Sequence, residues 1–185
     1  MPIDTQLSTE RLLLRPVGLQ DLEWIHGLHS LPESDRYNTM GIPADLSVTE
    51  AVMQGWFDEM AQGKKYVFAL TTLNGDFVGL AGMNIDRPRY ARAEIWYKLF
   101  PRYWGKGLAT EAVRALLQFG FGPLSLHRIE AGCAAENSAS ARVLQKAGFV
   151  QEGLSRKALP IRGEWKDGYN FGLLKEDWLH NNTKQ

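Results

Sequence analysis

The chain has 185 residues, and its 44% hydrophobic and 11% aromatic content is sufficient for one domain with a real core. Its 21 basic and 21 acidic residues give a formal net charge of zero, which argues against nucleic acid as the main partner. A single cysteine, Cys133, excludes an internal disulfide and a thiolate metal cluster, and no metal site is expected. We find no secretory signal and no run near the roughly 20 apolar residues of a membrane span, so we expect a cytoplasmic protein with no membrane partner.

Hydrophobic periodicity predicts one α/β (α+β) domain over residues 1–185, with an ordered core from about residue 7 to residue 178. Ser47 or Thr49 is expected to cap the second helix, and Asn74-Gly75 predicts a tight hairpin. The order strand, helix, strand over residues 93–134 predicts a parallel crossover. Strands are expected at residues 10–17, 66–72, 77–85, 93–100, 128–134, 154–160 and 164–174, and helices at 21–28, from 47 or 49 to 60, 108–120 and 137–148.

Two segments have less regular patterns. Residues 31–43 are rich in Pro, Ser, Asp, Asn and Gly, which indicates a loop. Tyr37, Asn38 and Met40 are candidates for lining a substrate entrance there, although a plain surface connection explains them equally well. Asp167-Gly168 lies inside the last predicted strand and is also compatible with a turn.

The segment Arg102–Ala112 changes from a strand pattern to a helix pattern across two glycines, Gly105 and Gly107. A helix that starts after such a turn offers unpaired backbone N–H groups and partial positive charge, which suits a phosphate or pyrophosphate. Glycines let the backbone turn tightly and approach the ligand. The spacing matches neither a Walker loop nor a dinucleotide fingerprint, so an ordinary strand-to-helix turn is the competing interpretation.

The strand before this segment carries one carboxylate, Glu94, among apolar residues. Side chains alternate along a strand, so Glu94 shares a face with Trp96 and Lys98. Such a carboxylate is either a solvated edge residue or a partly desolvated one. In the second case its pKa is raised, as a general base near neutral pH requires.

The predicted helix at 137–148 has a good N-cap in Asn137 and a good C-cap in Gly148. Asn137, Ser140 and Leu144 lie on one face, because residues three and four apart are neighbours on a helix. Capping explains Asn137, but it does not explain a serine on the apolar side.

Taken together, these motifs resemble the GNAT superfamily of acetyl-CoA-dependent N-acetyltransferases. The resemblance covers nearly the whole chain, from about Leu7 to Trp178, and it is closest to the Rim-type branch, which includes ribosomal-protein N-terminal alanine or serine acetyltransferases. Each motif is weak alone, and their order and spacing carry the resemblance. The motifs are Glu10-Arg11-Leu12, Glu94-Ile95-x-Tyr97, Arg102-x-Trp104-Gly105-Lys106-Gly107-x-Ala109-Thr110-Glu111-Ala112, Asn137-x-x-Ser140-x-Arg142-Val143-Leu144, Gly148-Phe149 and Asp177-Trp178.

The resemblance implies a mixed, mostly antiparallel sheet of about seven strands with about four helices. The sheet splays apart between the strands at 94–100 and 128–134, and acetyl-CoA lies in the gap. Backbone groups of Tyr97 and Leu99 pair with the pantetheine arm, Asn137 bonds it from the far side, and the glycine loop holds the pyrophosphate. The implied cofactor-binding residues are Tyr97, Leu99, Arg102, Gly105, Lys106, Gly107, Leu108, Ala109, Thr110 and Asn137.

The implied chemistry is direct transfer of acetyl from the thioester to an amine in a ternary complex. Glu94 matches the family's base, which removes a proton from the amine directly or through water, and a backbone N–H of its strand stabilises the oxyanion. Ser140 matches the Rim-type donor to the departing thiolate, because Leu144 stands where much of the superfamily has a tyrosine acid. Trp96 stands where relatives often have glycine, and it is expected to reshape the acceptor pocket.

The sequence leaves the acceptor open. A protein or peptide N-terminal amine is the first hypothesis, and a small amine such as a polyamine, an amino acid or an aminoglycoside is the rival within the same chemistry. A non-catalytic CoA-binding regulatory module is the alternative from a different class, and Glu94 and Ser140 argue against it. Homo-oligomerisation is also open.

Overall fold

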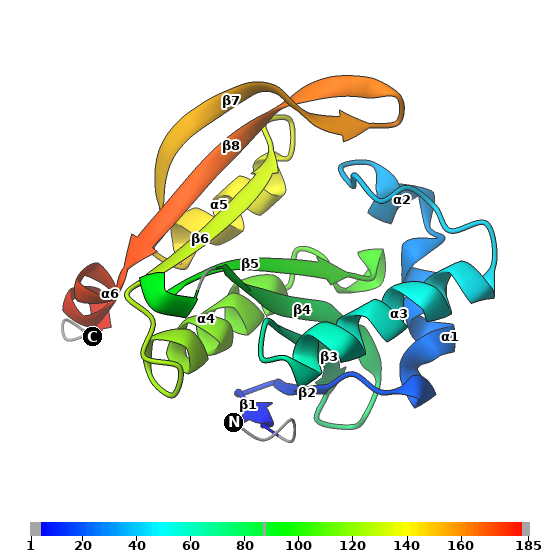
Figure 1. Ribbon diagram of the computed structural model, residues 1–185, viewed down its shortest axis with the longest axis horizontal. Coiled ribbons are helices and arrows are strands. Elements are labelled where there is room, and N and C mark those ends of the chain that lie inside the picture. Colours follow the sequence, from blue (N-terminus) through cyan, green and yellow to red (C-terminus); the bar gives the residue numbers. More distant parts are fainter. Residues whose placement is uncertain (1–4, 87, 183–185) are drawn as a thin grey trace.

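The computed structural model describes residues 5–86 and 88–182. Within them, eight strands form one mixed sheet in the order β1-β2-β3-β4-β5-β6-β8-β7 (Figure 1). All neighbouring strands are antiparallel except β5 and β6, which are parallel, so the predicted fold class and crossover are confirmed. The strands are β1 (Leu7–Ser8), β2 (Leu12–Pro16), β3 (Lys65–Thr72), β4 (Phe77–Asp86), β5 (Arg92–Leu99), β6 (Arg128–Ala134), β7 (Val150–Ile161) and β8 (Glu164–Leu174).

The helices include the four that were expected and two more. The additions are α2, a single turn inside the predicted loop, and α6 after the last strand; the eighth strand is the two-residue β1. The predicted cap of the second long helix is wrong: Asp45 caps it, accepting hydrogen bonds from the N–H groups of Ser47 (2.9 Å) and Val48 (3.2 Å). The helices are α1 (Leu22–His29), α2 (Pro32–Asp35), α3 (Leu46–Ala61), α4 (Leu108–Phe121), α5 (Ser138–Lys146) and α6 (Lys175–Asn182).

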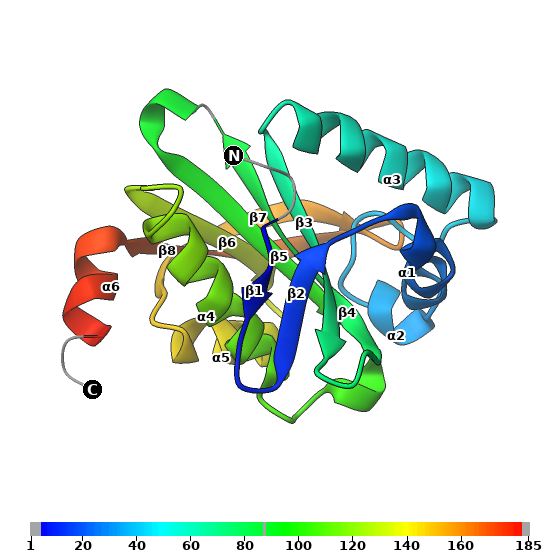
Figure 2. The ribbon, with the colours of Figure 1, turned by 90° about the horizontal axis from the view of Figure 1, so that it is seen from below.

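Two hydrophobic clusters cover the two faces of the sheet. On one face α4 packs through Leu116 and Phe119 against β2 to β5, where Phe119 meets the ring of Phe68 edge to face. On the other face α1 and α3 pack Ile25 and Trp56 against β3 and β4. Figure 2 shows α4 and α3 on opposite sides of the sheet. The apolar stripes predicted for these helices therefore cover both faces of the sheet beside β5.

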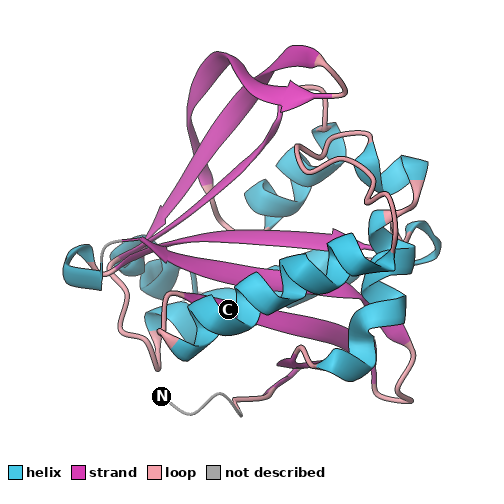
Figure 3. Ribbon diagram, turned by 45° about the vertical axis from the view of Figure 1, so that its right-hand side comes forward, coloured by secondary structure: helices cyan, strands magenta, loops and turns pink. Residues whose placement is uncertain are grey.

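The sheet divides beyond the middle of β5. The parallel ladder between β5 and β6 runs only from Arg92 opposite Arg128 to Ile95 opposite Ala131. Beyond that point β5 stays paired with β4 as far as Leu99, while β6 continues beside β8. Figure 3 shows the resulting opening, with β6, β7 and β8 rising away from the rest of the sheet. The splay implied by the family resemblance is present.

The second half of the sheet ends in the long β7–β8 hairpin, which turns at Arg162 and Gly163. Asp167 and Gly168 lie within β8, so the turn considered there is absent; instead Asp167 accepts a hydrogen bond from the N–H of Lys157 (2.8 Å) across an irregularity in β7. Along the described part of the chain, no helix is both long enough and apolar enough to cross a membrane.

Candidate active site

The glycine loop forms a tight turn at the start of α4. Gly105 and Gly107 have φ values of 72° and 80°, a left-handed conformation that other residues rarely adopt. Gly107 is the N-cap, and its carbonyl receives the first helical bond, from the N–H of Glu111 (3.1 Å). The N–H groups of residues 108–110 therefore have no acceptor within the helix and lie at its positive end.

An ion pair holds this loop against the first strands. The Arg11 side chain donates from Nε to Glu111 Oε2 (2.7 Å) and from Nη1 to the carbonyl of Lys106 (2.9 Å). Glu111 Oε1 also accepts from Thr9 Oγ1 (2.6 Å) and from the backbone N–H of Arg11 (2.8 Å). These bonds lower the pKa of Glu111 against the opposing effect of burial. The Glu10-Arg11-Leu12 motif thus acts by fixing the loop.

We expect Arg11→Ala to weaken CoA binding by about tenfold, because charged hydrogen bonds of this kind contribute about 1.5 kcal/mol or more. Isothermal titration with CoA measures the affinity. The matched control is Arg114→Ala, which removes an exposed arginine of α4 that donates to the Lys146 carbonyl at the end of α5. Equal affinities in the two variants would contradict a role for Arg11 in holding the loop.

A cavity of about 610 Å³ fills the opening between β5 and β6 and extends to the glycine loop. It is lined by the end of β5, the first turn of α4, the end of β6 and α5. The site residues predicted from the sequence that line it are Tyr97, Leu99, Gly105, Gly107, Leu108, Ala109, Thr110, Asn137 and Ser140.

The remaining predicted cofactor residues, Arg102 and Lys106, flank this cavity and are absent from its lining. The Arg102 guanidinium lies over the Phe100 and Tyr103 rings, 4.9 and 5.1 Å from their centroids, and Lys106 Nζ lies 5.6 Å from the Tyr103 centroid. Both charges remain near the loop, so they add positive potential there without pointing into the cavity.

Backbone orientation along β5 favours an extended ligand in the opening. The N–H of Phe100 donates to Val78 on β4 (3.0 Å), and peptide groups alternate along a strand. Those of Tyr97 and Leu99 therefore face the gap. The Leu99 carbonyl accepts from the indole N–H of Trp104 (2.8 Å), which anchors the start of the glycine loop to the strand.

Glu94 lies at the point where the splay begins, directly opposite Glu130 in the parallel ladder. Its side chain as a whole is exposed to solvent. The carboxylate nevertheless lies beside the cavity, because a Cβ added at Gly132, a cavity residue, would be 3.9 Å from Glu94 Oε1. Partial burial and the charge of Glu130 raise the pKa of Glu94. A carboxylate with a raised pKa is a better proton acceptor near neutral pH.

Ser140 forms a polar cluster with two residues that sequence reasoning did not connect to it. Its hydroxyl lies 2.8 Å from the Tyr97 hydroxyl, which also donates to the Ser140 carbonyl (3.3 Å). Burial raises the pKa of Cys133, against the smaller opposing effect of a hydrogen bond with Ser140. Burial raises the pKa of Tyr97 to about 12, so the phenol stays protonated and is available as a donor.

Asn137 caps α5 as predicted, accepting the N–H of Ser140 (3.1 Å) at its side-chain oxygen. Of the three predicted entrance residues, Tyr37 and Asn38 line the cavity, while Met40 is exposed elsewhere. Trp96 does not line it: its ring packs over Gly82 and lies 6.0 Å from that of Trp56.

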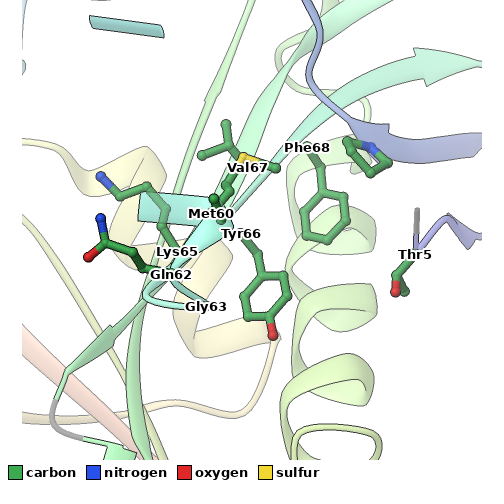
Figure 4. A pocket seen from close by; sticks show the side chains of 10 residues that line it. Thr5, Met60, Gln62, Gly63, Lys65, Tyr66, Val67 and Phe68 are labelled. Carbon is green, nitrogen blue, oxygen red and sulfur yellow. The ribbon is translucent and has the colours of Figure 1, made fainter. Parts of the chain in front are cut away.

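A second cavity, of about 430 Å³, lies between the end of α3 and β3 (Figure 4). Met60, Gln62 and Tyr66 are among its lining residues, and it contains none of the predicted site residues. Across the described residues no three His, Cys, Asp or Glu side chains are grouped to hold a metal ion. The predicted site residues that line a cavity therefore all lie at the cavity of the splay.

Comparison with known proteins agrees with this geometry. The family model described as "Acetyltransferase (GNAT) domain" matches residues 11–150. The chain is a GNAT acetyltransferase. An uncharacterized N-acetyltransferase of Bacillus licheniformis is 36% identical over 173 residues, which is 93% of this chain and 97% of that protein. GNAT acetyltransferases use acetyl-CoA, so the chain is an acetyl-CoA-dependent N-acetyltransferase.

Solved structures of the family share the fold over almost the full length. A GNAT acetyltransferase from Bacillus anthracis is 30% identical, has a TM-score of 0.81, and covers 93% of this chain and 99% of its own. A spermidine N-acetyltransferase from Vibrio cholerae, in complex with CoA and spermine, has a TM-score of 0.84 at 23% identity, covering 92% and 99%. A putative ribosomal N-acetyltransferase of Bacillus subtilis is 33% identical over 57% of each chain. The named acceptors thus differ among relatives.

Proposed function

We propose that this GNAT acetyltransferase acetylates the N-terminal amine of a protein or peptide by direct attack in a ternary complex, with Glu94 as the base and Ser140 as the donor to sulfur. The observation that carries the proposal is the position of Glu94. It lies at the apex of the splay beside the cavity, with a raised pKa, and the anion-binding turn lies at the other end of the same opening.

Three features along the cavity lining support CoA binding. The outward N–H groups at the start of α4 suit the pyrophosphate, and the gap-facing peptides of Tyr97 and Leu99 suit the amides of the pantetheine arm. Asn137 lies across the opening from them. Acetyl-CoA, when bound there, supplies an acetyl thioester. The residues of the chain do the rest: they hold the cofactor, accept the proton of the amine and donate to the sulfur.

The proton balance favours an α-amine as the acceptor. An N-terminal α-ammonium has an ordinary pKa of about 8, whereas an alkyl ammonium such as that of lysine has one of about 10.4. Glu94 takes one proton from the ammonium, and the freed lone pair forms the new C–N bond to the acetyl carbon. The C–S bond breaks with its electrons going to the sulfur, and the second nitrogen proton is lost to solvent. Proton transfer costs less free energy when the pKa values of the donor and the acceptor are closer. A carboxylate with a raised pKa is therefore better matched to an α-amine than to an alkyl amine.

In this proposal the hydroxyls of Ser140 and Tyr97 stabilise the leaving sulfur. A thiolate has a pKa of about 8.5, so it needs hydrogen bonding more than full protonation. When the Tyr97 hydroxyl donates its one proton to Ser140 Oγ, 2.8 Å away, and not to the Ser140 carbonyl, the Ser140 proton is free to be donated to the sulfur. The proton removed by Glu94 leaves to solvent at the exposed side of that residue.

We expect Ser140→Ala to lower kcat about tenfold with little change in KM for acetyl-CoA, because one hydrogen bond to a charged group contributes about 1.5 kcal/mol. Tyr97→Phe is expected to lower kcat by less, since it removes only the orienting bond. Steady-state kinetics measure both. A kcat for Ser140→Ala equal to that of the wild type would remove Ser140 from the mechanism.

A competition assay tests the acceptor. Purified protein with acetyl-CoA is offered a peptide that has both a free α-amine and a lysine, together with spermidine, and mass spectrometry locates the acetyl group. We expect acetylation at the α-amine. Acetylation of spermidine alone would transfer the assignment to the polyamine class, and CoA binding without any transfer would indicate a regulatory module.

A further inference from the structure

Unpartnered polar side chains gather where the segment after α1 meets β5. Across residues 5–86 and 88–182, the buried side-chain atoms that lack a hydrogen bond include Ser34 Oγ, Asn38 Nδ2 and Lys98 Nζ, and these three residues all line the cavity of the splay. Buried polar groups are nearly always paired, so a cluster of unpaired ones calls for an explanation. A ligand that supplies the missing partners is the simplest one.

Of these three residues, Lys98 has the largest free-energy cost of burial, because it carries a charge. It lies on the same face of β5 as Glu94, and its ammonium group is buried without a hydrogen bond. Burial lowers the pKa of Lys98 to about 8, although the charge of Asp35 opposes this shift. Even so, the side chain is mostly protonated at neutral pH. An unpaired buried charge is strongly unfavourable, so an anionic partner would bind there with a clear gain.

The nearby side chains do not neutralise Lys98. Asp35 directs Oδ2 to Arg162 Nε at the tip of the β7–β8 hairpin (3.0 Å), and its Oδ1 has no hydrogen-bond partner. Figure 1 shows α2, which carries Asp35, beside that hairpin tip. His29 is uncharged at neutral pH, because burial and the charge of Lys98 lower its pKa to about 4. Lys98 and Arg162 thus share the Asp35 carboxylate. The other charged residues in this part of the lining, Glu33 and Arg36, are of opposite sign, so a positive charge remains over this part of the cavity.

We propose that Lys98, with the Asn38 amide and the Ser34 hydroxyl as further donors, forms a subsite for a carboxylate of the acceptor. This inference rests on the proposed function and narrows its substrate to amines that carry a carboxylate nearby. Polyamines have only cationic groups, so the same subsite disfavours them. It also gives α2 and the hairpin tip a role in holding the acceptor side of the cavity.

The spacing along β5 indicates where the carboxylate sits in the acceptor. Lys98 lies four positions after Glu94, about 13 Å along the strand at roughly 3.3 Å per residue, and the long lysine side chain spans part of that distance. An amine at Glu94 and a carboxylate at Lys98 are therefore several bonds apart. An N-terminal residue followed by Asp or Glu meets this spacing better than a free α-amino acid does.

Matched acceptors test the subsite. The kcat/KM values are measured for two peptides that differ only in Glu or Gln at the second position, and for free glutamate and spermidine. We expect the wild type to prefer the Glu peptide by about tenfold, the effect of one charge-assisted hydrogen bond. Lys98→Met should remove this preference by raising the KM of the Glu peptide. It should change kcat/KM for the Gln peptide by no more than about twofold, and it should not lower the activity on spermidine. Lys98→Arg should retain part of the preference.

A preference for free glutamate over the Glu peptide would support the subsite and would place the acceptor carboxylate closer to the amine.

Two controls separate this inference from other roles of Lys98. Lys64→Met removes an exposed lysine outside the cavity and should change nothing. CoA affinity should be the same in Lys98→Met as in the wild type; a loss there would assign Lys98 to the cofactor and overturn the subsite. Equal losses for the Glu and Gln peptides, or no preference in the wild type, would overturn it too.

Binding separates a failure of the subsite from a failure of the proposed function. Titration of the CoA-loaded protein with the two peptides needs no turnover. If no amine is acetylated, tighter binding of the Glu peptide that disappears in Lys98→Met still supports the subsite. Equal binding of both peptides would overturn it.

Discussion

Replacing Glu94 by Gln is expected to lower kcat by at least about a hundredfold, the usual contribution of a general base. The amide has nearly the same shape but accepts no proton at neutral pH. Binding of CoA should be unchanged, because Glu94 lies outside the cavity lining. Steady-state kinetics on the best acceptor, with CoA affinity from titration, give both quantities.

The pH dependence of kcat tests whether Glu94 is the base. Burial and the charge of Glu130 raise its pKa, so the base is lost by protonation at a higher pH than for an ordinary glutamate. Wild-type kcat should therefore fall, as the pH is lowered, at a pH above the usual glutamate range. Glu130→Gln removes the neighbouring charge and should move this fall to lower pH. An active Glu94→Gln enzyme with the wild-type profile would contradict the assignment.

The second large effect is expected at the glycine loop. Gly107→Trp should weaken CoA binding by about a hundredfold, because it redirects two or more N–H groups at the start of α4, each contributing about 1.5 kcal/mol to an anion. The residue has φ of 80°, and a Cβ there would lie 3.4 Å from Arg11 Nη2. Titration with CoA measures the loss.

Gly75→Trp is the matched control for Gly107→Trp. Gly75 has φ of 92° in the β3–β4 hairpin, and a Cβ there meets no atom within 4 Å. The strain of a left-handed residue, about 1–2 kcal/mol, is then common to both variants. A similar fall in Tm with a loss of CoA affinity only for Gly107→Trp is expected. Wild-type affinity in Gly107→Trp would remove the loop from the cofactor site.

Local sequence signals predicted the elements well where the backbone itself sets the conformation. Asn74-Gly75 predicted the hairpin between β3 and β4, and the glycines at 105 and 107 predicted the turn before α4. The N-cap of α3 was harder to predict, because Asp45 and Ser47 are both good cap residues and lie two positions apart. The helix begins at Leu46, so Asp45 is the cap. The splay followed only from the family resemblance, since strand pairing is not encoded in a local pattern.

The parts of the site that the sequence did not reveal depend on long-range packing. Tyr97 and Ser140 are 43 residues apart, and their hydroxyls meet because β5 and α5 lie on either side of the opening. Alternation placed Lys98 on the same face of its strand as Glu94, but its burial without a partner comes from the segment after α1 folding over the end of β5. No periodicity reports such contacts.

Direct transfer in a ternary complex is the central claim, and a single-turnover experiment tests it most directly. Protein loaded with acetyl-CoA is analysed by intact mass, first alone and then after mixing with an N-terminal peptide. We predict that the protein stays unmodified throughout and that the acetyl group appears on the α-amine of the peptide as free thiol is released. An acetyl group on the protein before the peptide is added, for example at Cys133 or Ser140, would contradict the account.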